Sequence, residues 1–279
     1  MILADNWKEY SLLDAGDGEK LEIWGNIKVI RPDPQAIWAR SKYINWNDAH
    51  MYYHRSKSGG GSWESLKKTP DSWAINYKNM CFNIRPTGFK HMGLFPEQAI
   101  NWDWLQEMIQ RPAKILNLFA YTGAATVACL KAGASVVHVD AAKGINNHAK
   151  ENITFGECRI ITDDVQKFVM REIRRGNKYD GIIMDPPVFG RGPSGELWKL
   201  EQHLYPLVQI CKNLLSDNPI FFLINAYTAG YSPSVFGNIL SQIIPNGVIS
   251  TDEIGIKSET GIVLPCGMFA RCSLNFFRN

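Results

Sequence analysis

The chain has 279 residues, enough for one large domain or for a medium domain with a small one. Hydrophobic residues make up 45% of it and charged residues 20%, as in ordinary globular proteins, and no apolar run approaches the 18 residues of a membrane-spanning helix. The formal net charge of +3 permits a nucleic-acid partner without requiring one.

The cysteines do not form the common zinc motifs. None of the six belongs to a CxxC pair or to a His/Cys metal spacing, so we expect no metal site. Cysteines scattered through apolar segments are typical of a reducing compartment. The N-terminus carries Asp5, Lys8 and Glu9 in place of a secretory signal. We therefore expect a cytoplasmic protein.

Residues 1–92 are predicted to form a small β-rich domain, and residues 93–279 a second, larger one. Short aromatic-rich segments alternate with turn residues in the first part, which is typical of strands. These segments are Leu21–Trp24, Lys28–Ile30, Met51–Tyr53, Trp73–Tyr77 and Cys81–Ile84. The Ser- and Gly-rich stretch 58–62 is predicted to be a loop.

Basic and aromatic residues interleave between Arg40 and Trp63. Cations for phosphates and flat rings for stacking are the composition of a nucleic-acid surface. The residues are Arg40, Lys42, Tyr43, Trp46, His50, Tyr52, Tyr53, His54, Arg55, Lys57 and Trp63. The alternative is a small β domain whose aromatic residues are core and whose cations face solvent.

A helix is predicted after the segment 91–98, with Pro96 near its first turn. Trp102, Leu105, Met108 and Ile109 recur at helical spacing, which indicates a packed apolar face.

Residues 115–140 have the pattern of a βαβ unit. An apolar run from Ile115 to Phe119 predicts a buried strand, and Tyr121-Thr122-Gly123 predicts a tight turn. An Ala-rich helix ends at Gly133, and a second strand ends in Asp140. Such units bind nucleosides at the turn and through the carboxylate after the second strand, which can accept hydrogen bonds from ribose hydroxyls.

The turn lacks the G-x-G-x-x-G fingerprint that dinucleotides require. Gly123 is the only glycine of the turn, so the turn lacks the further glycines that let a backbone approach a pyrophosphate closely. A ligand with a ribose and no phosphate is favoured, and S-adenosylmethionine meets that description. The alternative is a structural βαβ unit in which the aspartate occurs by chance.

Strands and helices alternate from residue 141 onward. Helices are predicted at 143–152, from 165, at 197–215 and at 234–244, and strands at 159–162, 181–184 and 220–225. Two final strands, about 247–257 and 262–275, follow each other without a helix and predict a hairpin. The fold class is therefore α/β: a doubly wound, mostly parallel, Rossmann-like sheet of seven strands.

Polar residues follow the five predicted strands that precede the final hairpin. Because the carboxyl ends of the strands meet at one crevice, we expect these groups to form the site. They are Tyr121-Thr122-Gly123, Asp140, Asp163-Asp164, Asp185-Pro186-Pro187 and Asn225-Ala226-Tyr227. Asp140 is expected to hold the ribose, and Asp163 or Asp164 to accept the adenine amino group.

The sequence Asp185-Pro186-Pro187 predicts a rigid turn with a carboxylate in the crevice. A base amine could donate to Asp185 and to the Pro186 carbonyl, and Phe189 could stack on the extruded base. Catalysis would then be mainly positioning.

These motifs resemble class I S-adenosylmethionine-dependent large-subunit ribosomal RNA methyltransferases, the branch that modifies cytosine C5 or guanine N7. The resemblance covers roughly residues 80–279. It lies in Phe119-Ala120-Tyr121-Thr122-Gly123, Asp140, Asp164, Asp185-Pro186-Pro187-Val188-Phe189 and the entry segment Gly93-Leu94-Phe95-Pro96-Glu97-Gln98. It implies cofactor contacts from Phe95, from residues 119–123, from Asp140 with the adjoining Ala141, and from Asp163, Asp164 and Asp185.

Two features depart from that family. Its usual N-terminal RNA-binding module, of the PUA type, is not recognisable in residues 1–80. The family's cysteine after the fifth strand is also missing, because Asn225-Ala226-Tyr227-Thr228 stands there. Cytosine-C5 transfer needs a thiolate, so a nitrogen target is favoured, and Cys266 and Cys272 are interpreted as core residues.

The sequence thus predicts a methyltransferase that uses S-adenosylmethionine, with RNA of the ribosomal type as its partner and substrate. Alternatives are a small-molecule or protein acceptor, a nicotinamide oxidoreductase, and a non-catalytic RNA-binding module on the same fold.

Overall fold

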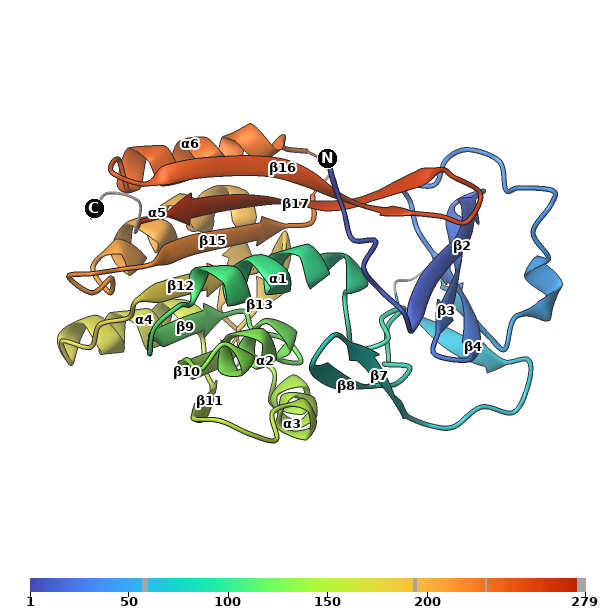
Figure 1. The fold of residues 1–279 in the computed structure, drawn as a ribbon, viewed down its shortest axis with the longest axis horizontal. Coiled ribbons are helices and arrows are strands. Elements are labelled where there is room, and N and C mark those ends of the chain that lie inside the picture. Colours follow the sequence, from blue (N-terminus) through green and yellow to red (C-terminus); the bar gives the residue numbers. More distant parts are fainter. Residues whose placement is uncertain (57–59, 193–194, 229, 275–279) are drawn as a thin grey trace. The chain divides into compact units, whose positions relative to one another are not determined.

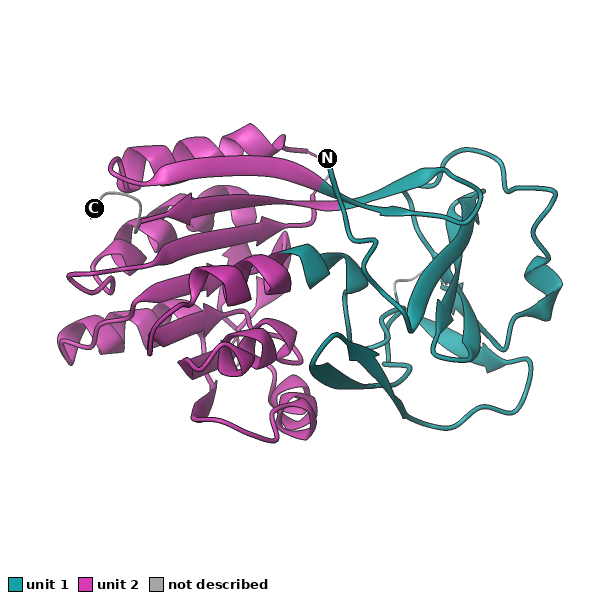
Figure 2. Ribbon diagram, viewed as in Figure 1, with its two compact units in different colours: residues 1–100, 254–266 teal, residues 101–253, 267–279 magenta. Residues whose placement is uncertain are grey.

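A computed structural model describes residues 1–56, 60–192, 195–228 and 230–274. The chain divides into two compact units (Figure 2). Unit 1 comprises Met1–Ile100 and Ile254–Cys266, and unit 2 comprises Asn101–Glu253 and Gly267–Asn279. The first unit therefore takes in a late segment, 254–266, that the order of the sequence does not suggest.

Unit 1 is built on a five-stranded sheet in the order β2-β3-β4-β5-β6. The strands are β2 (Tyr10–Gly16), β3 (Glu19–Trp24), β4 (Ile27–Pro32), β5 (Met51–Arg55) and β6 (Gly61–Ser65), and a separate hairpin joins β7 (Trp73–Tyr77) to β8 (Met80–Ile84). Only the β4–β5 pair among these is parallel. All five strands predicted in this region are present.

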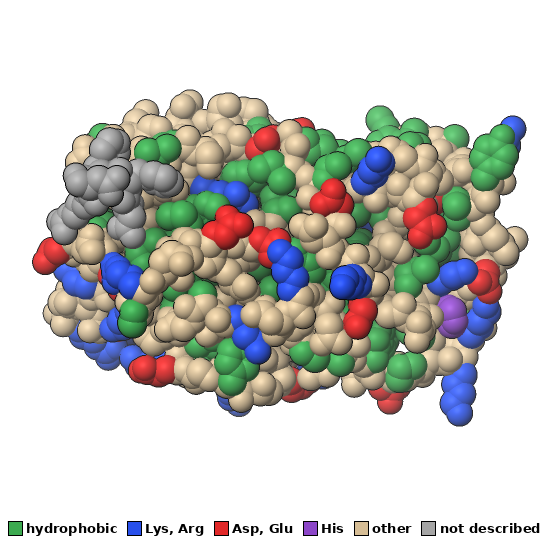
Figure 3. Space-filling model, viewed as in Figure 1, with side chains coloured by type: hydrophobic (Ala, Val, Ile, Leu, Met, Phe, Trp, Pro, Cys, Tyr) green, Lys and Arg blue, Asp and Glu red, His purple; other side chains and the backbone are tan. Residues whose placement is uncertain are grey.

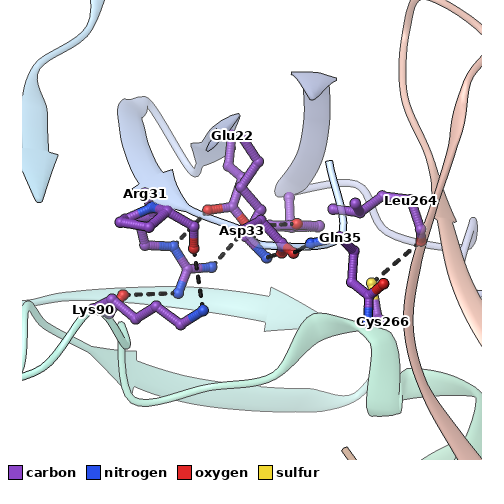
Figure 4. Close-up of polar contacts among 10 residues, drawn as sticks. Glu22, Arg31, Asp33, Gln35, Lys90, Leu264 and Cys266 are labelled. Carbon is purple, nitrogen blue, oxygen red and sulfur yellow. Dashed lines mark hydrogen bonds and ion pairs between the residues drawn. The ribbon is translucent and has the colours of Figure 1, made fainter. Parts of the chain in front are cut away.

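A buried ion network supports this sheet (Figure 4). Arg31 makes two hydrogen bonds to the fully buried Glu22 carboxylate, from Nε at 2.6 Å and Nη2 at 2.8 Å. Arg31 also donates to the Lys90 carbonyl (3.0 Å), and Lys90 Nζ donates to the Pro32 carbonyl (3.1 Å). Burial alone would raise the pKa of Glu22, yet Arg31 and Lys20 lower it to about 2, so the carboxylate stays charged.

The basic and aromatic residues of 40–63 divide between core and surface. Trp46 and Tyr53 are buried, as the packed-domain alternative expects. The Arg40 guanidinium lies 4.0 Å from the centroid of the Trp46 ring and pairs with Glu19. Tyr43, by contrast, is 85% exposed. Lys57, Ser58 and Gly59 lie outside the described residues.

Unit 2 is a mostly parallel α/β sheet in the order β16-β17-β15-β12-β9-β10-β11 (Figure 1). Its strands are β9 (Lys114–Leu118), β10 (Ser135–Asp140), β11 (Cys158–Thr162), β12 (Gly181–Met184), β15 (Phe221–Ala226), β16 (Val248–Lys257) and β17 (Val263–Ser273). The pairs among β11, β10, β9, β12 and β15 are parallel, and β17 is antiparallel to β15. The seven predicted strands are therefore present. The short β1 (Ile2–Leu3), which was not predicted, pairs with Ile254 and Gly255 of β16.

Helices cover both faces of this sheet. They are α1 (Ala99–Met108, after the 3-10 turn η2, Pro96–Gln98), α2 (Ala124–Lys131), α3 (Lys143–Asn152), α4 (Val165–Arg174), α5 (Leu200–Lys212) and α6 (Pro233–Ile243). Residues of α4, α5 and α6 share one apolar core with Leu116 and Leu118 of β9. Asn117, between those two leucines, points to the opposite face and donates to Thr126 of α2.

The surface of unit 2 carries cations over α4, where Lys and Arg side chains gather in the view of Figure 3. The last turn of α4 contains Arg171 and Arg174, which suits the negative end of the helix dipole. None of the helices in the described part of the chain has the length and apolar character needed to cross a bilayer.

One predicted element is wrong at its start. Residues 197–199 were expected in a helix, but they form β14 (Leu197–Lys199), which pairs with β13 (Phe189–Arg191). The helix α5 begins only at Leu200, because cross-strand hydrogen bonding engages the preceding residues. The final strand ends at Ser273, and residue 275 of the prediction lies outside the described residues.

Candidate active site

The loop that follows β9 has an unusual backbone. Phe119 (φ 55°), Tyr121 (φ 50°) and Gly123 (φ 89°) are all left-handed. Only glycine adopts this conformation without strain, and strained residues of other types cluster at functional sites. A Cβ at Gly123 would also lie 3.0 Å from Ile153. The loop is thus held in one conformation at the carboxyl end of β9.

Asp140 organises this loop from the end of β10. Its Oδ2 accepts from the Tyr121 N–H (3.0 Å) and its Oδ1 from the Ala142 N–H (2.9 Å). Burial raises the pKa of Asp140, while the backbone N–H groups of Ala142, Tyr121 and Ala141 oppose that shift. A carboxylate has about four acceptor positions, so at least one is left for a ligand hydroxyl. Ala120 joins the same framework through its N–H to Val139 (3.1 Å).

A buried chain of hydrogen bonds lies beneath the loop, and sequence reasoning did not identify it. Asn117 donates to Thr126 Oγ1 (2.9 Å), and Thr126 contacts His138 Nδ1 (3.0 Å). His138 Nε2 contacts Asn146 Oδ1 (3.1 Å), and Asn146 Nδ2 donates to the carbonyls of Asp140 and Ile161 (both 3.1 Å). The network therefore joins β9, α2, β10, α3 and β11 directly behind Asp140.

Protonation of His138 is opposed by its surroundings. Burial lowers the pKa of His138 to about 4, although the hydrogen bond to Asn146 acts in the other direction. The imidazole is therefore neutral at pH 7, with Nε2–H donating to Asn146 and Nδ1 accepting from Thr126. The nearest sequence signal was a polar residue within the apolar run 136–139.

The two aspartates after β11 already have partners inside the protein. Asp163 forms an ion pair with Arg171. Asp164 caps α4, where its Oδ1 accepts from the Lys167 N–H (2.9 Å). The Asp163 N–H donates to the Asp140 carbonyl (3.2 Å), so both predicted contacts to adenine lie beside the predicted contact to ribose.

The Asp185-Pro186-Pro187 turn leaves β12 next to the end of β9. The Asp185 N–H contacts the Leu118 carbonyl at 3.3 Å, and the side chain is half-buried. Pro186 is buried and Pro187 exposed. Phe189, two residues further on, is 57% exposed. An apolar ring this exposed, four residues after Asp185 in the sequence, is available to contact a ligand.

Trp198 of β14 connects the turn to the loop after β9. Its Nε1–H donates to the Pro187 carbonyl (2.6 Å), and its ring packs against Phe119 with centroids 5.0 Å apart. The same ring also lies near His203 of α5, with centroids 5.5 Å apart. Sequence reasoning did not assign Trp198 to the site, because a tryptophan in a predicted helix suggests only packing.

The three predicted residues not yet described, Thr122, Phe95 and Asn225, lie in three different parts of the chain. Thr122 is buried in the same loop. Phe95 belongs to unit 1, where it precedes η2 and its ring lies 5.1 Å from that of His91. Asn225 is buried at the end of β15 and accepts from Asn101 (2.9 Å).

The cysteines of the terminal hairpin are unsuited to act as thiolates. Burial raises the pKa of Cys272 to about 12 and that of Cys266 well above its usual value. Among residues 1–56, 60–192, 195–228 and 230–274, no three His, Cys, Asp or Glu side chains are placed to hold a metal ion.

The doubly wound sheet, the single-glycine turn and the carboxylates at the strand ends define a class I methyltransferase fold. A family model described as S-adenosylmethionine-dependent methyltransferase matches residues 30–244. The chain belongs to that family, and the nicotinamide oxidoreductase alternative is thereby wrong.

The chain is similar to curated relatives over part of their length. It is 27% identical over 180 residues to the Ribosomal RNA large subunit methyltransferase K/L of Syntrophotalea carbinolica, which covers 62% of this chain and 25% of that protein. It is 37% identical over 82 residues to the Ribosomal RNA large subunit methyltransferase I of an Enterobacter species, 27% of this chain and 21% of that protein. The chain thus spans about a quarter of the length of the curated relatives it matches.

Two solved structures show similarity across both units. A SAM-dependent methyltransferase from Agrobacterium tumefaciens is 34% identical, with a TM-score of 0.91 over 98% of this chain and 92% of that one. A SAM-dependent methyltransferase from Streptococcus mutans is 17% identical, with a TM-score of 0.74 over 96% and 76%, and shows the shared fold alone.

The residues at the strand ends fit S-adenosylmethionine, the cofactor of the family. The Asp140 carboxylate keeps acceptor capacity for a ribose hydroxyl. The left-handed residues Phe119, Tyr121 and Gly123 fix the conformation of the loop at the end of β9, where the cofactor would bind. When bound, the cofactor supplies a methyl group that is already activated on a sulfonium.

Proposed function

We propose that this methyltransferase acts on a nitrogen of an RNA base, with ribosomal RNA as the substrate. The observation that carries the proposal is the Asp185-Pro186-Pro187 turn with the exposed Phe189 beside it, adjacent to the loop after β9. A carboxylate, a rigid proline turn and an exposed ring together can hold a flat amine-bearing group.

Asp185 and the Pro186 carbonyl are proposed to accept the N–H groups of an exocyclic base amine. The Pro187 carbonyl already accepts from Trp198, so it is not the preferred acceptor for a second donor. Phe189 stacks on the face of the base and fixes its plane. The nitrogen lone pair is then oriented by this chain, which is the main catalytic contribution. The nitrogen would bond to the methyl carbon as the bond from that carbon to the sulfonium sulfur breaks, leaving a neutral thioether, and the nitrogen would lose a proton to Asp185 or water.

On the cofactor side, Asp140 is proposed to accept from the ribose, and Phe119, Ala120, Tyr121, Thr122 and Gly123 to enclose the ligand. Asp163, Asp164 and Ala141 complete the contacts that we propose within unit 2. The Asp163 side chain pairs with Arg171, and the Asp164 side chain caps α4. We therefore propose that backbone groups of residues 163 and 164 make the main contact of this segment with the cofactor.

A nitrogen target is supported by the positions and surroundings of the cysteines near the end of the chain. Carbon 5 of cytosine is not nucleophilic until a thiolate adds to the ring. No cysteine stands directly after β15, where the sequence reads Tyr227-Thr228, and burial raises the pKa of both hairpin thiols. A base nitrogen needs no such addition.

An RNA acceptor is supported by the names of the relatives and by unit 1. Both types of curated relative are ribosomal RNA large subunit methyltransferases. We propose that residues 1–92 serve as the RNA-binding domain and residues 93–279 as the methyltransferase domain. The 85% exposed Tyr43 with Lys42 beside it, its Nζ 5.4 Å from the ring centroid, offers a stacking group and a cation.

The proposal is tested by following labelled methyl from S-adenosylmethionine into an extract of cells that lack this protein. The extract is separated into RNA, protein and small-molecule fractions, with nuclease and protease controls. The proposal requires nuclease-sensitive label in the RNA fraction. Label confined to protein or small molecules would establish the alternative acceptor class.

A further inference from the structure

The hairpin of β13 and β14 presents two chemically different faces. Phe189 pairs with Lys199, Gly190 with Trp198, and Arg191 with Leu197. Directly paired residues of an antiparallel hairpin point to the same face, and residues two apart on one strand do as well. Phe189, Arg191, Leu197 and Lys199 therefore share one face, and Gly190 and Trp198 share the other.

The face shared by the four residues, called the outer face here, is apolar and cationic. Phe189 is 57% exposed and Leu197 is 44% exposed, and Arg191 is also exposed. Within the described residues, neither Arg191 nor Lys199 forms an ion pair. The neighbouring Glu196 is paired with Lys167 of α4, so its charge is already balanced. The outer face thus offers two apolar contacts and two uncompensated cations.

The opposite face holds the hairpin in place. The Trp198 ring contacts Phe119 and His203, and its N–H binds the Pro187 carbonyl. Gly190 allows the strand to approach the turn closely, since a Cβ there would lie 3.3 Å from Pro187 Cγ. The outer face is therefore preformed before any ligand binds, and its ordering costs little on binding.

We propose that the outer face of this hairpin binds the single-stranded RNA that flanks the target base. The inference rests on the RNA substrate proposed above. Leu197 supplies an apolar contact for a neighbouring base, and Arg191 and Lys199 bind backbone phosphates. A duplex cannot present its bases to such a surface, so the flanking segment is unpaired. Residues two apart on a strand are about 7 Å apart, which lets one face contact more than one nucleotide.

The experiment compares the full-length protein with the double variant Arg191→Glu/Leu197→Ser. Neither residue belongs to the proposed catalytic or cofactor groups. Arg174→Glu is the matched control: it makes the same charge change at an exposed arginine of unit 2 on α4. S-adenosylmethionine affinity, measured by calorimetry, checks that each variant keeps its fold.

Binding is measured by fluorescence anisotropy with a labelled single-stranded RNA of about 15 nucleotides and with the same strand in a duplex. The double variant is expected to bind the single strand at least about tenfold more weakly, with a salt slope smaller by about 0.7 for each lost phosphate contact. Its KM for RNA in methyl transfer rises more than kcat falls. Arg174→Glu is expected to leave the RNA affinity, the salt slope and the KM for RNA near their wild-type values.

Equal RNA affinity and equal KM in the double variant, or an equal loss in Arg174→Glu, would overturn the inference even if wild-type protein methylates RNA. Stronger binding of the duplex would overturn the single-strand assignment. If wild-type protein methylates only a non-RNA acceptor, the proposed function fails first and this inference fails with it.

Discussion

At the residue scale, Asp140 combines the ribose contact that we propose with a structural role in the loop after β9. The pattern of a strand ending in an aspartate predicts only the ribose contact. The structure adds that its carboxylate fixes Tyr121 and Ala142, so the proposed ribose contact and the loop conformation depend on the same group. No sequence pattern indicates the second role, because the loop and the carboxylate are 19 residues apart.

Replacing Asp140 with Ala should weaken S-adenosylmethionine binding by at least about tenfold, since hydrogen bonds to a charged group contribute about 1.5–3 kcal/mol. Calorimetry measures the affinity, and circular dichroism confirms that the variant is folded. An affinity within twofold of wild type would rule out the ribose assignment.

Asp185 is expected to behave differently, because we place it on the acceptor. In the Asp185→Ala variant, kcat should fall by about 10²-fold or more while cofactor affinity changes little. Asp185→Asn keeps an acceptor oxygen and should recover part of the rate. Single-turnover transfer assays separate the two variants, and full activity in Asp185→Ala would contradict the role.

His138 makes the stability of the fold dependent on pH. The folded protein holds this imidazole at a pKa of about 4, against an ordinary value of 6.5, so the unfolded chain binds more protons between these values. Its contribution to stability is therefore present above pH 6.5 and is lost as the pH falls toward 4, by about 3 kcal/mol in total.

The variant His138→Gln should lose this component of the pH dependence. Urea unfolding at several pH values between 7 and 4 measures the free energy of unfolding for both proteins. Parallel curves for wild type and variant would show that His138 does not titrate with folding.

At the scale of elements, β13 and β14 are where sequence and structure differ most. Gly190, Gly192 and Gly195 are typical of a loop, and the apolar residues from Leu197 onward predicted a helix. Three residues of that helix pair instead as β14, because Trp198 gains contacts with Phe119 and Pro187 that a helix start would not provide. Such contacts between distant segments override local propensity and cannot be read from local periodicity.

The Trp198 indole N–H has a measurable role in this arrangement. Trp198→Phe keeps a ring against Phe119 and removes the donor to the Pro187 carbonyl, so we expect kcat to fall about tenfold with cofactor affinity nearly unchanged. Trp73→Phe is the control, since Trp73 makes a similar indole bond to the Trp24 carbonyl (2.9 Å) in unit 1. Equal kcat losses in the two variants would indicate a general effect on stability.

At the scale of the whole molecule, the sequence predicted the order of helices and strands in the sheet of unit 2, but it did not predict that residues 254–266 belong to unit 1. The repeated βα pattern and the final hairpin indicate the doubly wound sheet, since parallel strands need crossover helices. The assignment of 254–266 to unit 1 depends on contacts of β16 and β17 that no local pattern encodes. The sequence did not predict the buried ion pair of Glu22 and Arg31 either, because one partner lies on β3 and the other on β4 and neither strand alone indicates the pairing.

The most direct test of the whole account identifies the methylated atom. RNA from cells that lack the protein is incubated with methyl-labelled S-adenosylmethionine and either wild-type protein or Asp185→Ala, then digested to nucleosides. We predict label on a base nitrogen with wild-type protein and none with the variant. Label on cytosine C5, or unlabelled RNA from a protein that binds the cofactor, would contradict the account.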